Sequence, residues 1–188
     1  MGAAWNALLS AWGLAPWSNP AVATSVTAKT VVFDIADNWG DGSYVGVTAI
    51  EFKLGGVLVA VTTEFTAYST TNYSGSYQAQ YVFDTSKDKT GSGAGTSWFS
   101  AAVPSNQRLI VVFDSEQTFD EIVVNNFHIA AGSYSMGAQN VKITWTASSY
   151  TDTTYNASVT GGTVLNNTAW PQHVAGNVAD DQTVWTFS

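Results

Sequence analysis

The stretch "NVKITWTA", residues 140–147, shows the pattern on which the fold prediction depends. Its second, fourth and sixth residues, Val141, Ile143 and Trp145, are apolar, and the residues between them are polar. Side chains of a β-strand point to opposite faces in turn, so a period of two is typical of a strand with one buried face. The stretch therefore predicts a half-buried strand whose apolar face meets a core.

Further runs of strand type stand upstream, separated by short polar segments. They span residues 31–36, 50–54, 57–63, 79–83, 108–113 and 121–126. Turn-forming, glycine-containing groups lie between them, at residues 40–42, 55–56, 74–75, 91–95 and 132–133. Many short strands without helical patterns between them indicate an antiparallel sandwich or jelly roll. We therefore predict an all-β fold with its core in residues 30–147.

Composition limits the classes of partner and chemistry. The chain has 188 residues, which suits one domain with two extensions. Its formal net charge of -8 at pH 7 opposes binding to nucleic acid or to an anionic membrane. The chain has no cysteine, which excludes disulfides, thiolate nucleophiles and zinc–cysteine sites. No run approaches the ~20 apolar residues of a membrane span.

Residues 1–29 form an extension with a helical pattern. Four apolar residues follow the spacing i, i+3, i+4 and i+7, namely Trp5, Leu8, Leu9 and Trp12. Gly13 and Pro16 are expected to end this short amphipathic helix. A secretory signal is the less favoured alternative, because no basic residue precedes Lys29. The apolar stripe, together with Trp17, predicts an assembly interface and a homo-oligomer.

Residues 148–188 form the second extension, with a weaker β pattern. "YNASVTGGTVLNNT" (155–168) is typical of a hairpin that turns at residues 161–162, and "QTVWTF" (182–187) of a final strand. Trp170 and Trp185 are expected to pack against other parts of the protein.

Several motifs of the central region together resemble the discoidin or coagulation-factor type C family. They are "GDGSYVGVTAIEF" (40–52), "YVFD" (81–84), "GTSWFSAA" (95–102), "RLIVVFD" (108–114) and "TFDEIVVNN" (118–126). The resemblance covers residues 30–147. It implies a galactose-binding-like jelly-roll β-sandwich, and it implies that Trp98 is a buried anchor.

The resemblance also implies a structural Ca²⁺ in the loop after residue 84. The matching ligands are the Asp84 carboxylate and the Thr96 hydroxyl, with Asp88 as an optional third. Oxygen ligands on a flexible loop suit Ca²⁺ better than Mg²⁺ or Zn²⁺. An alternative stays open, in which Asp84 accepts hydrogen bonds from backbone groups and only caps a turn.

Two aromatic loops are candidates for ligand binding. "DIADNWGDGSY" (34–44) carries Asn38, Trp39 and Asp41, and we expect Trp39 to be exposed on its turn. "YSTTNYSGSY" (68–77) carries a second set, Tyr73 and Tyr77. Aromatic faces beside amide and carboxylate groups suit a sugar ring and its hydroxyls. The alternative is that the tyrosines pack on neighbouring strands or subunits.

The motifs of catalysis are missing from the sequence. His128 and His173 stand in no nucleophile or carboxylate motif, so we do not expect an enzyme. The sequence favours a non-catalytic carbohydrate or cell-surface binding module, as a subunit of a viral (phage) particle or tail appendage, or an extracellular protein. Expected partners are a glycan and other virion subunits. The alternative is a purely structural virion subunit without glycan binding.

Overall fold

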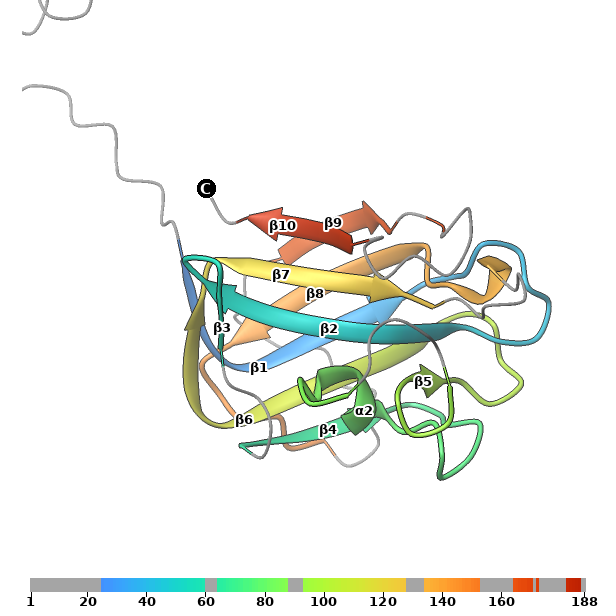
Figure 1. Cartoon of the computed structure of the whole chain (residues 1–188), viewed down its shortest axis with the longest axis horizontal. Helices are drawn as coiled ribbons and strands as arrows, with labels where there is room; N and C mark the ends of the chain where they lie inside the picture. The colour runs from blue at the N-terminus through green and yellow to red at the C-terminus, as the bar shows by residue number, and fades with distance from the viewer. Residues whose placement is uncertain are drawn as a thin grey trace, which may run out of the picture.

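The computed structural model describes residues 25–59, 64–87, 93–127, 134–152, 164–170, 172 and 182–186. These residues form two antiparallel β-sheets with very little helix, so the all-β prediction is confirmed (Figure 1). The strands are β1 (Val26–Ile35), β2 (Gly46–Leu54), β3 (Val57–Leu58), β4 (Phe65–Ser69), β5 (Trp98–Phe99), β6 (Gln107–Phe119), β7 (Glu121–Asn126), β8 (Asn140–Thr146), β9 (Val164–Ala169) and β10 (Gln182–Thr186). The helical elements are α2 (Ala79–Phe83) and the short 3₁₀ helix η1 (Tyr134–Met136).

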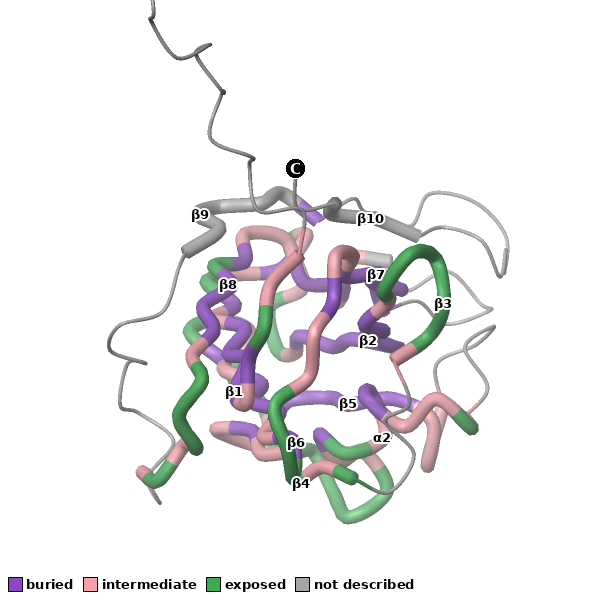
Figure 2. Tube along the Cα trace, turned by 90° about the vertical axis from the view of Figure 1, so that its left-hand side faces the viewer, coloured by how far each residue is buried: buried purple, intermediate pink, exposed green. Residues whose placement is uncertain are grey.

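The two sheets face each other as a sandwich. The first sheet has the strand order β4-β6-β1-β8-β9, and the second has the order β10-β7-β2-β3, with β5 paired beside β2. Figure 2 shows that buried residues gather along the strands between the sheets, whereas the turn between β2 and β3 is exposed.

Aromatic rings from both sheets fill the core. Phe52 of β2 is fully buried, and its ring centroid lies 5.3 Å from that of Phe113 and 4.9 Å from that of Phe119, both on β6. Phe33 of β1 lies 6.4 Å from the same ring. Burying one such side chain stabilises the fold by roughly 1.5 to 3 kcal/mol, so this contact between the sheets is a major source of stability.

The strand β8 confirms the prediction made from "NVKITWTA". Val141 and Ile143 are fully buried and Trp145 is 7% exposed, whereas Lys142 on the opposite face is exposed. The strand lies between β1 and β9, with Asp34 of β1 directly opposite Lys142.

The outward face of the first sheet is partly covered, which the alternation pattern did not predict. Val32 and Ile110 are cross-strand partners on that face, and both are fully buried. Residues 147–152, which we call the strap, return across this face after β8. The Thr30 hydroxyl donates a hydrogen bond of 2.7 Å to the Ser148 carbonyl of the strap. This contact places the strap beside the buried pair.

The prediction of a strand at residues 79–83 is wrong, because this segment is the helix α2. Ala79, Val82 and Phe83 are its buried residues, and their spacing i, i+3, i+4 matches one face of a helix. The Phe83 ring lies 6.0 Å from that of Phe33. The helix packs against β2 and β4, so it contributes to the core between the two sheets.

The predicted final strand is confirmed as β10, and the chain after residue 147 contributes to both sheets. β9 pairs with β8 in the first sheet, and β10 pairs with β7 in the second. The sequence-based division at residue 147 places these strands in an extension, whereas in the structure they complete the sandwich. Trp170 is fully buried, with its ring 6.2 Å from that of Phe33.

Two predictions concern residues outside the described part of the chain. They are the hairpin turn at residues 161–162 and the interface formed by Trp5, Leu8, Leu9, Trp12 and Trp17. Of the strand expected at residues 57–63, the described part is β3, which forms a tight hairpin with β2. Within the described residues, no helix has the length and apolar character needed to cross a membrane.

The sandwich has two different ends (Figure 1). We call one the loop end, where residues 36–45, 70–77, 100–106 and 134–139 connect the elements. We call the other the hairpin end, where residues 55–56 join β2 to β3.

Candidate functional site

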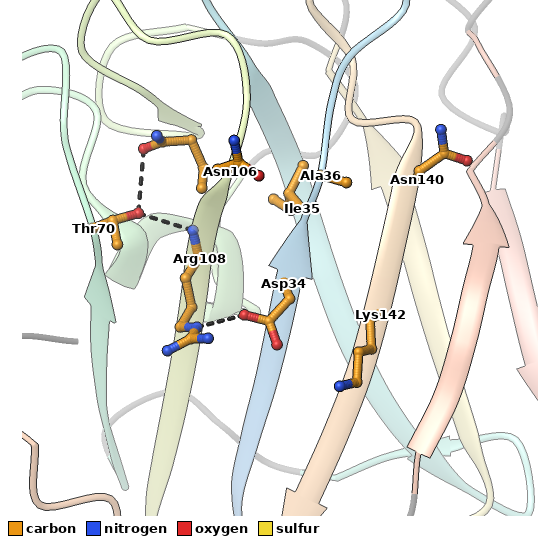
Figure 3. Close-up of a pocket in the computed structure, with 9 residues that line it drawn as sticks. Asp34, Ile35, Ala36, Thr70, Asn106, Arg108, Asn140 and Lys142 are labelled. Atoms are coloured by element: carbon orange, nitrogen blue, oxygen red, sulfur yellow. Dashed lines mark hydrogen bonds and ion pairs between the residues drawn. The ribbon is translucent and has the colours of Figure 1, made fainter. Parts of the chain in front are cut away.

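A hollow of about 350 Å³ opens on the outward face of the first sheet near the loop end (Figure 3). It is lined by residues 34–36 and 106–108, by Thr70, and by Asn140 and Lys142. These residues come from β1, β6 and β8 and from the loops that adjoin β1, β4 and β6, so the site depends on strand pairing. We call it the Ala36 hollow.

The hollow exists because a small residue stands between longer ones. Ala36 follows β1, and its backbone carbonyl accepts a hydrogen bond from the Asn106 amide at 3.0 Å. Its own amide donates to the Asn140 carbonyl at 2.8 Å. Ala36 is therefore flanked by two asparagines, and its methyl group leaves space that a longer side chain would fill.

A row of charged residues borders the hollow. Asp34 on β1 is directly opposite Arg108 on β6 and Lys142 on β8. The Arg108 Nε donates to Asp34 Oδ1 at 2.5 Å. Lys142 is exposed, and Figure 3 shows its side chain extending across the sheet on the side of Asp34. A carboxylate acceptor therefore lies between two cationic donors.

The strap also contacts Arg108. Tyr150 forms a hydrogen bond with the Arg108 side chain, and its hydroxyl donates to Asp152 Oδ2 at 3.4 Å. Burial raises the pKa of the Tyr150 hydroxyl above its usual value, and the neighbouring guanidinium, which favours the phenolate, opposes part of this rise. Arg108 is thus fixed between a carboxylate and a phenol.

Hydrogen bonds also fix the wall of the hollow at Thr70. The Arg108 backbone amide donates to Thr70 Oγ1 at 2.9 Å, and this hydroxyl donates to Gln107 Oε1 at 3.2 Å. Thr71 Oγ1 donates to the same Gln107 oxygen. Because Gln107 is only 4% exposed, its side chain orders both threonines.

Asn106 lies at the mouth of the hollow in an unusual backbone conformation. Its φ angle is 53°, the left-handed region that Asn tolerates better than most residues. Its side chain is exposed. The turn therefore places an amide group, with one acceptor and two donors, beside Ala36.

A second feature of the loop end is a cluster of aromatic rings around Tyr73. Tyr73 is 54% exposed, and its ring lies 5.6 Å from Tyr44, 5.7 Å from Tyr77 and 5.7 Å from Phe99. Phe99 stacks in turn on Phe127 at 4.9 Å. The Tyr73 amide donates to the Phe99 carbonyl at 2.7 Å, so the exposed ring has a fixed support.

The predicted ligand loop around Trp39 differs from expectation. Trp39 is partly buried, and its indole Nε1 donates to the Trp170 carbonyl at 3.1 Å, so the expectation of an exposed ring is wrong. Asn38 is 8% exposed, and its amide donates to the backbone carbonyls of Asp41 and Tyr44. Asp41 Oδ1 accepts from two backbone amides of the same turn. These polar groups shape the loop.

The predicted calcium ligands each make local hydrogen bonds. Asp84 Oδ1 accepts from the Ser86 amide at 3.0 Å and from its hydroxyl at 2.6 Å, which matches the turn-capping alternative. Thr96 Oγ1 bonds the Gly93 backbone at 3.1 Å. Asp88 lies outside the described residues. In the part of the chain that the structure describes, no three acidic or histidine side chains are grouped to hold a metal ion. Calcium binding stays a prediction.

Trp98 is a buried anchor, as predicted. It is fully buried in β5, and its indole Nε1 donates to the Thr71 carbonyl at 2.9 Å. It thereby ties the Tyr73 loop to the second sheet. His128 and His173 lie outside the described residues.

Sequence reasoning missed the residues of the Ala36 hollow. Alternation placed Asp34 and Lys142 on the polar side of two strands, but it carried no information about which strands pair. Asn106 carried the one local signal, since an asparagine in a loop is compatible with a positive φ angle. Comparison with protein-family models, with curated proteins and with solved structures finds no match to this chain.

Proposed function

We propose that this protein is a non-catalytic carbohydrate or cell-surface binding module that binds a glycan at its loop end. The observation that carries the proposal is the exposed Tyr73 ring on its aromatic support, at the same end of the sandwich as the polar Ala36 hollow. Sugar binding combines stacking on an aromatic face with hydrogen bonds to hydroxyl groups. Both kinds of group are present at this end.

The finer fold assignment and the context belong to the same proposal. We infer a discoidin-type, galactose-binding-like jelly roll, which is supported by two antiparallel sheets and by the buried Trp98. We further infer that the chain is a subunit of a phage particle or tail appendage. Sandwiches of this kind serve many functions, so the glycan assignment depends on the site and not on the fold.

A binding experiment tests the proposal with the full chain. Glycan-array binding is measured first, and the affinity for the best glycan is then compared between the wild type and Tyr73→Ala. Removing the exposed ring is expected to weaken binding by about tenfold, which corresponds to about 1.4 kcal/mol. Val57→Ala, which truncates an exposed side chain at the hairpin end, is the matched control and should leave the affinity unchanged. Absence of binding to every glycan would contradict the proposal.

A purely structural role in an assembly is the second candidate, and the hairpin end favours it. Leu54, Val57 and Leu58 are 44%, 70% and 38% exposed, and they form an apolar tip around the Gly55–Gly56 turn. Exposed apolar groups of this kind often mark contacts with other subunits. Size measurement of the full chain and of Val57→Asp tests this role. Assembly through the tip predicts a smaller particle for the variant, and an unchanged size would argue against it.

A further inference from the structure

We infer that the Ala36 hollow is a binding subsite for a neutral sugar, and that it recognises a pair of adjacent hydroxyl groups. This inference rests on the glycan-binding function proposed above, and it specifies both the place and the chemical class of the ligand. Tyr73 then supplies a separate contact at the same end of the sandwich.

A hydrogen-bond acceptor and a donor stand side by side on neighbouring strands of the first sheet. Asp34 and Lys142 are directly opposite each other across β1 and β8, a position in which Cβ atoms lie roughly 5 Å apart. A sugar hydroxyl donates one hydrogen bond and accepts others. One hydroxyl can therefore donate to the carboxylate while its neighbour accepts from the ammonium group. Hydrogen bonds to charged partners are about twice as strong as neutral ones.

Asp34 and Lys142 both have hydrogen-bonding capacity left for a ligand. Asp34 uses Oδ1 for Arg108, and its side chain is still 31% exposed. Lys142 is exposed and makes no ion pair with any residue that the structure describes. Thr70 and Gln107, in contrast, bond to each other and form a fixed wall. A ligand thus meets available hydrogen-bonding groups on Asp34 and Lys142, beside a wall that is already ordered.

The charge around the hollow distinguishes between neutral and acidic sugars. Two cations, Arg108 and Lys142, and one carboxylate, Asp34, line the hollow, and two more carboxylates are hydrogen-bonded outside the lining: Asp37, which accepts from Asn140, and Asp152, which accepts from Tyr150. The surroundings are therefore slightly negative, in a chain of net charge -8. A sugar carboxylate gains no net attraction from such a field. Alternating donors and acceptors suit a neutral polyol.

The Asn106 amide offers a third contact to a ligand in the hollow. Its backbone conformation also allows a substitution that removes only the side chain. Because its φ angle is 53°, Asn106→Gly removes the amide group without straining the turn. Ala36→Gln instead places a longer side chain in the hollow, and Ala36 is exposed, so the fold has room for it. Ser115→Gln is the matched control, since Ser115 is exposed elsewhere on β6, far along the strand from Arg108.

The experiment titrates the full chain with matched monosaccharides and follows backbone amide signals by NMR. The panel pairs the methyl glycosides of glucose, galactose and mannose with those of their uronic acids. We expect a neutral member to shift signals of residues 34–36, 106–108 and 140–142, and its uronic acid to bind about fivefold more weakly. Ala36→Gln should weaken binding at least about tenfold and Asn106→Gly about threefold, with Ser115→Gln unchanged.

Other outcomes separate this inference from the proposed function. Sugar binding that Tyr73→Ala removes but Ala36→Gln and Asn106→Gly leave intact would overturn the subsite and leave glycan binding standing. Tighter binding of a uronic acid than of its neutral partner would overturn the neutral class. Failure of every member of the panel to bind would overturn the subsite, whereas the proposed function falls only if the glycan array is also negative.

Discussion

Replacement of Trp98 by alanine should destabilise the fold strongly. The side chain is fully buried, and its indole bonds the Thr71 carbonyl, so the variant loses both packing and a hydrogen bond. Truncation of a buried tryptophan typically costs about 4 kcal/mol, a large part of the stability of a single domain. Trp98→Phe keeps most of the apolar volume and loses mainly the hydrogen bond, for a cost of about 1.5 kcal/mol.

Urea unfolding followed by far-ultraviolet circular dichroism measures both variants. The free energy of unfolding is expected to fall by about 2 kcal/mol per molar urea, so Trp98→Ala should lower the unfolding midpoint by about 2 M and Trp98→Phe by about 0.7 M. A midpoint for Trp98→Ala within about 0.3 M of the wild type would contradict the role of Trp98 in the core, because that value lies close to the error of the method. Equal shifts for the two variants would refute the role of packing.

Gly46→Ala should lower the free energy of unfolding, measured in urea, by at least about 2 kcal/mol, because the new Cβ would stand 2.6 Å from the Phe127 ring. Gly42→Ala places its Cβ in open space and should change the same free energy by less than about 0.5 kcal/mol. Equal effects of the two changes would contradict this packing. Because the pKa of Tyr150 is raised in the folded state, wild-type stability should fall as pH rises above about 10, and Tyr150→Phe should fall less steeply in thermal melts over that range. If the thermal stability of the wild type and of Tyr150→Phe fell in parallel with pH, the result would count against the burial of the Tyr150 hydroxyl. If Ca²⁺ binds the loop as the family resemblance implies, Ca²⁺ should raise the thermal midpoint and Asp84→Asn should abolish the rise. A midpoint that EDTA and Ca²⁺ both leave unmoved would argue against the metal site.

The fold was predictable wherever one face of a strand meets the core. β8 shows this, since its buried apolar residues follow the alternation of "NVKITWTA", although Thr144 on the outward face is buried as well. α2 was not predictable in the same way, because five residues with three apolar positions fit either a strand or one turn of helix. The outcome depended on packing between β2 and β4, which the local sequence does not contain.

The candidate site was predictable only in part, because its contacts are distant in sequence. The Tyr73 loop was identified from composition, and its ring is exposed as a binding role requires. Trp39 was misjudged because its hydrogen-bond partner, the Trp170 carbonyl, is 131 residues away. The Ala36 hollow was missed because it combines three strands whose order in the sheet the sequence does not state.

Glycan binding at the loop end is tested most directly by a crystal structure of the full chain with the tightest ligand from the glycan array. We expect sugar density against the Tyr73 ring or in the hollow beside Ala36, with hydroxyl groups near Asp34 and Lys142. Sugar density confined to the hairpin end, around Val57, would contradict it.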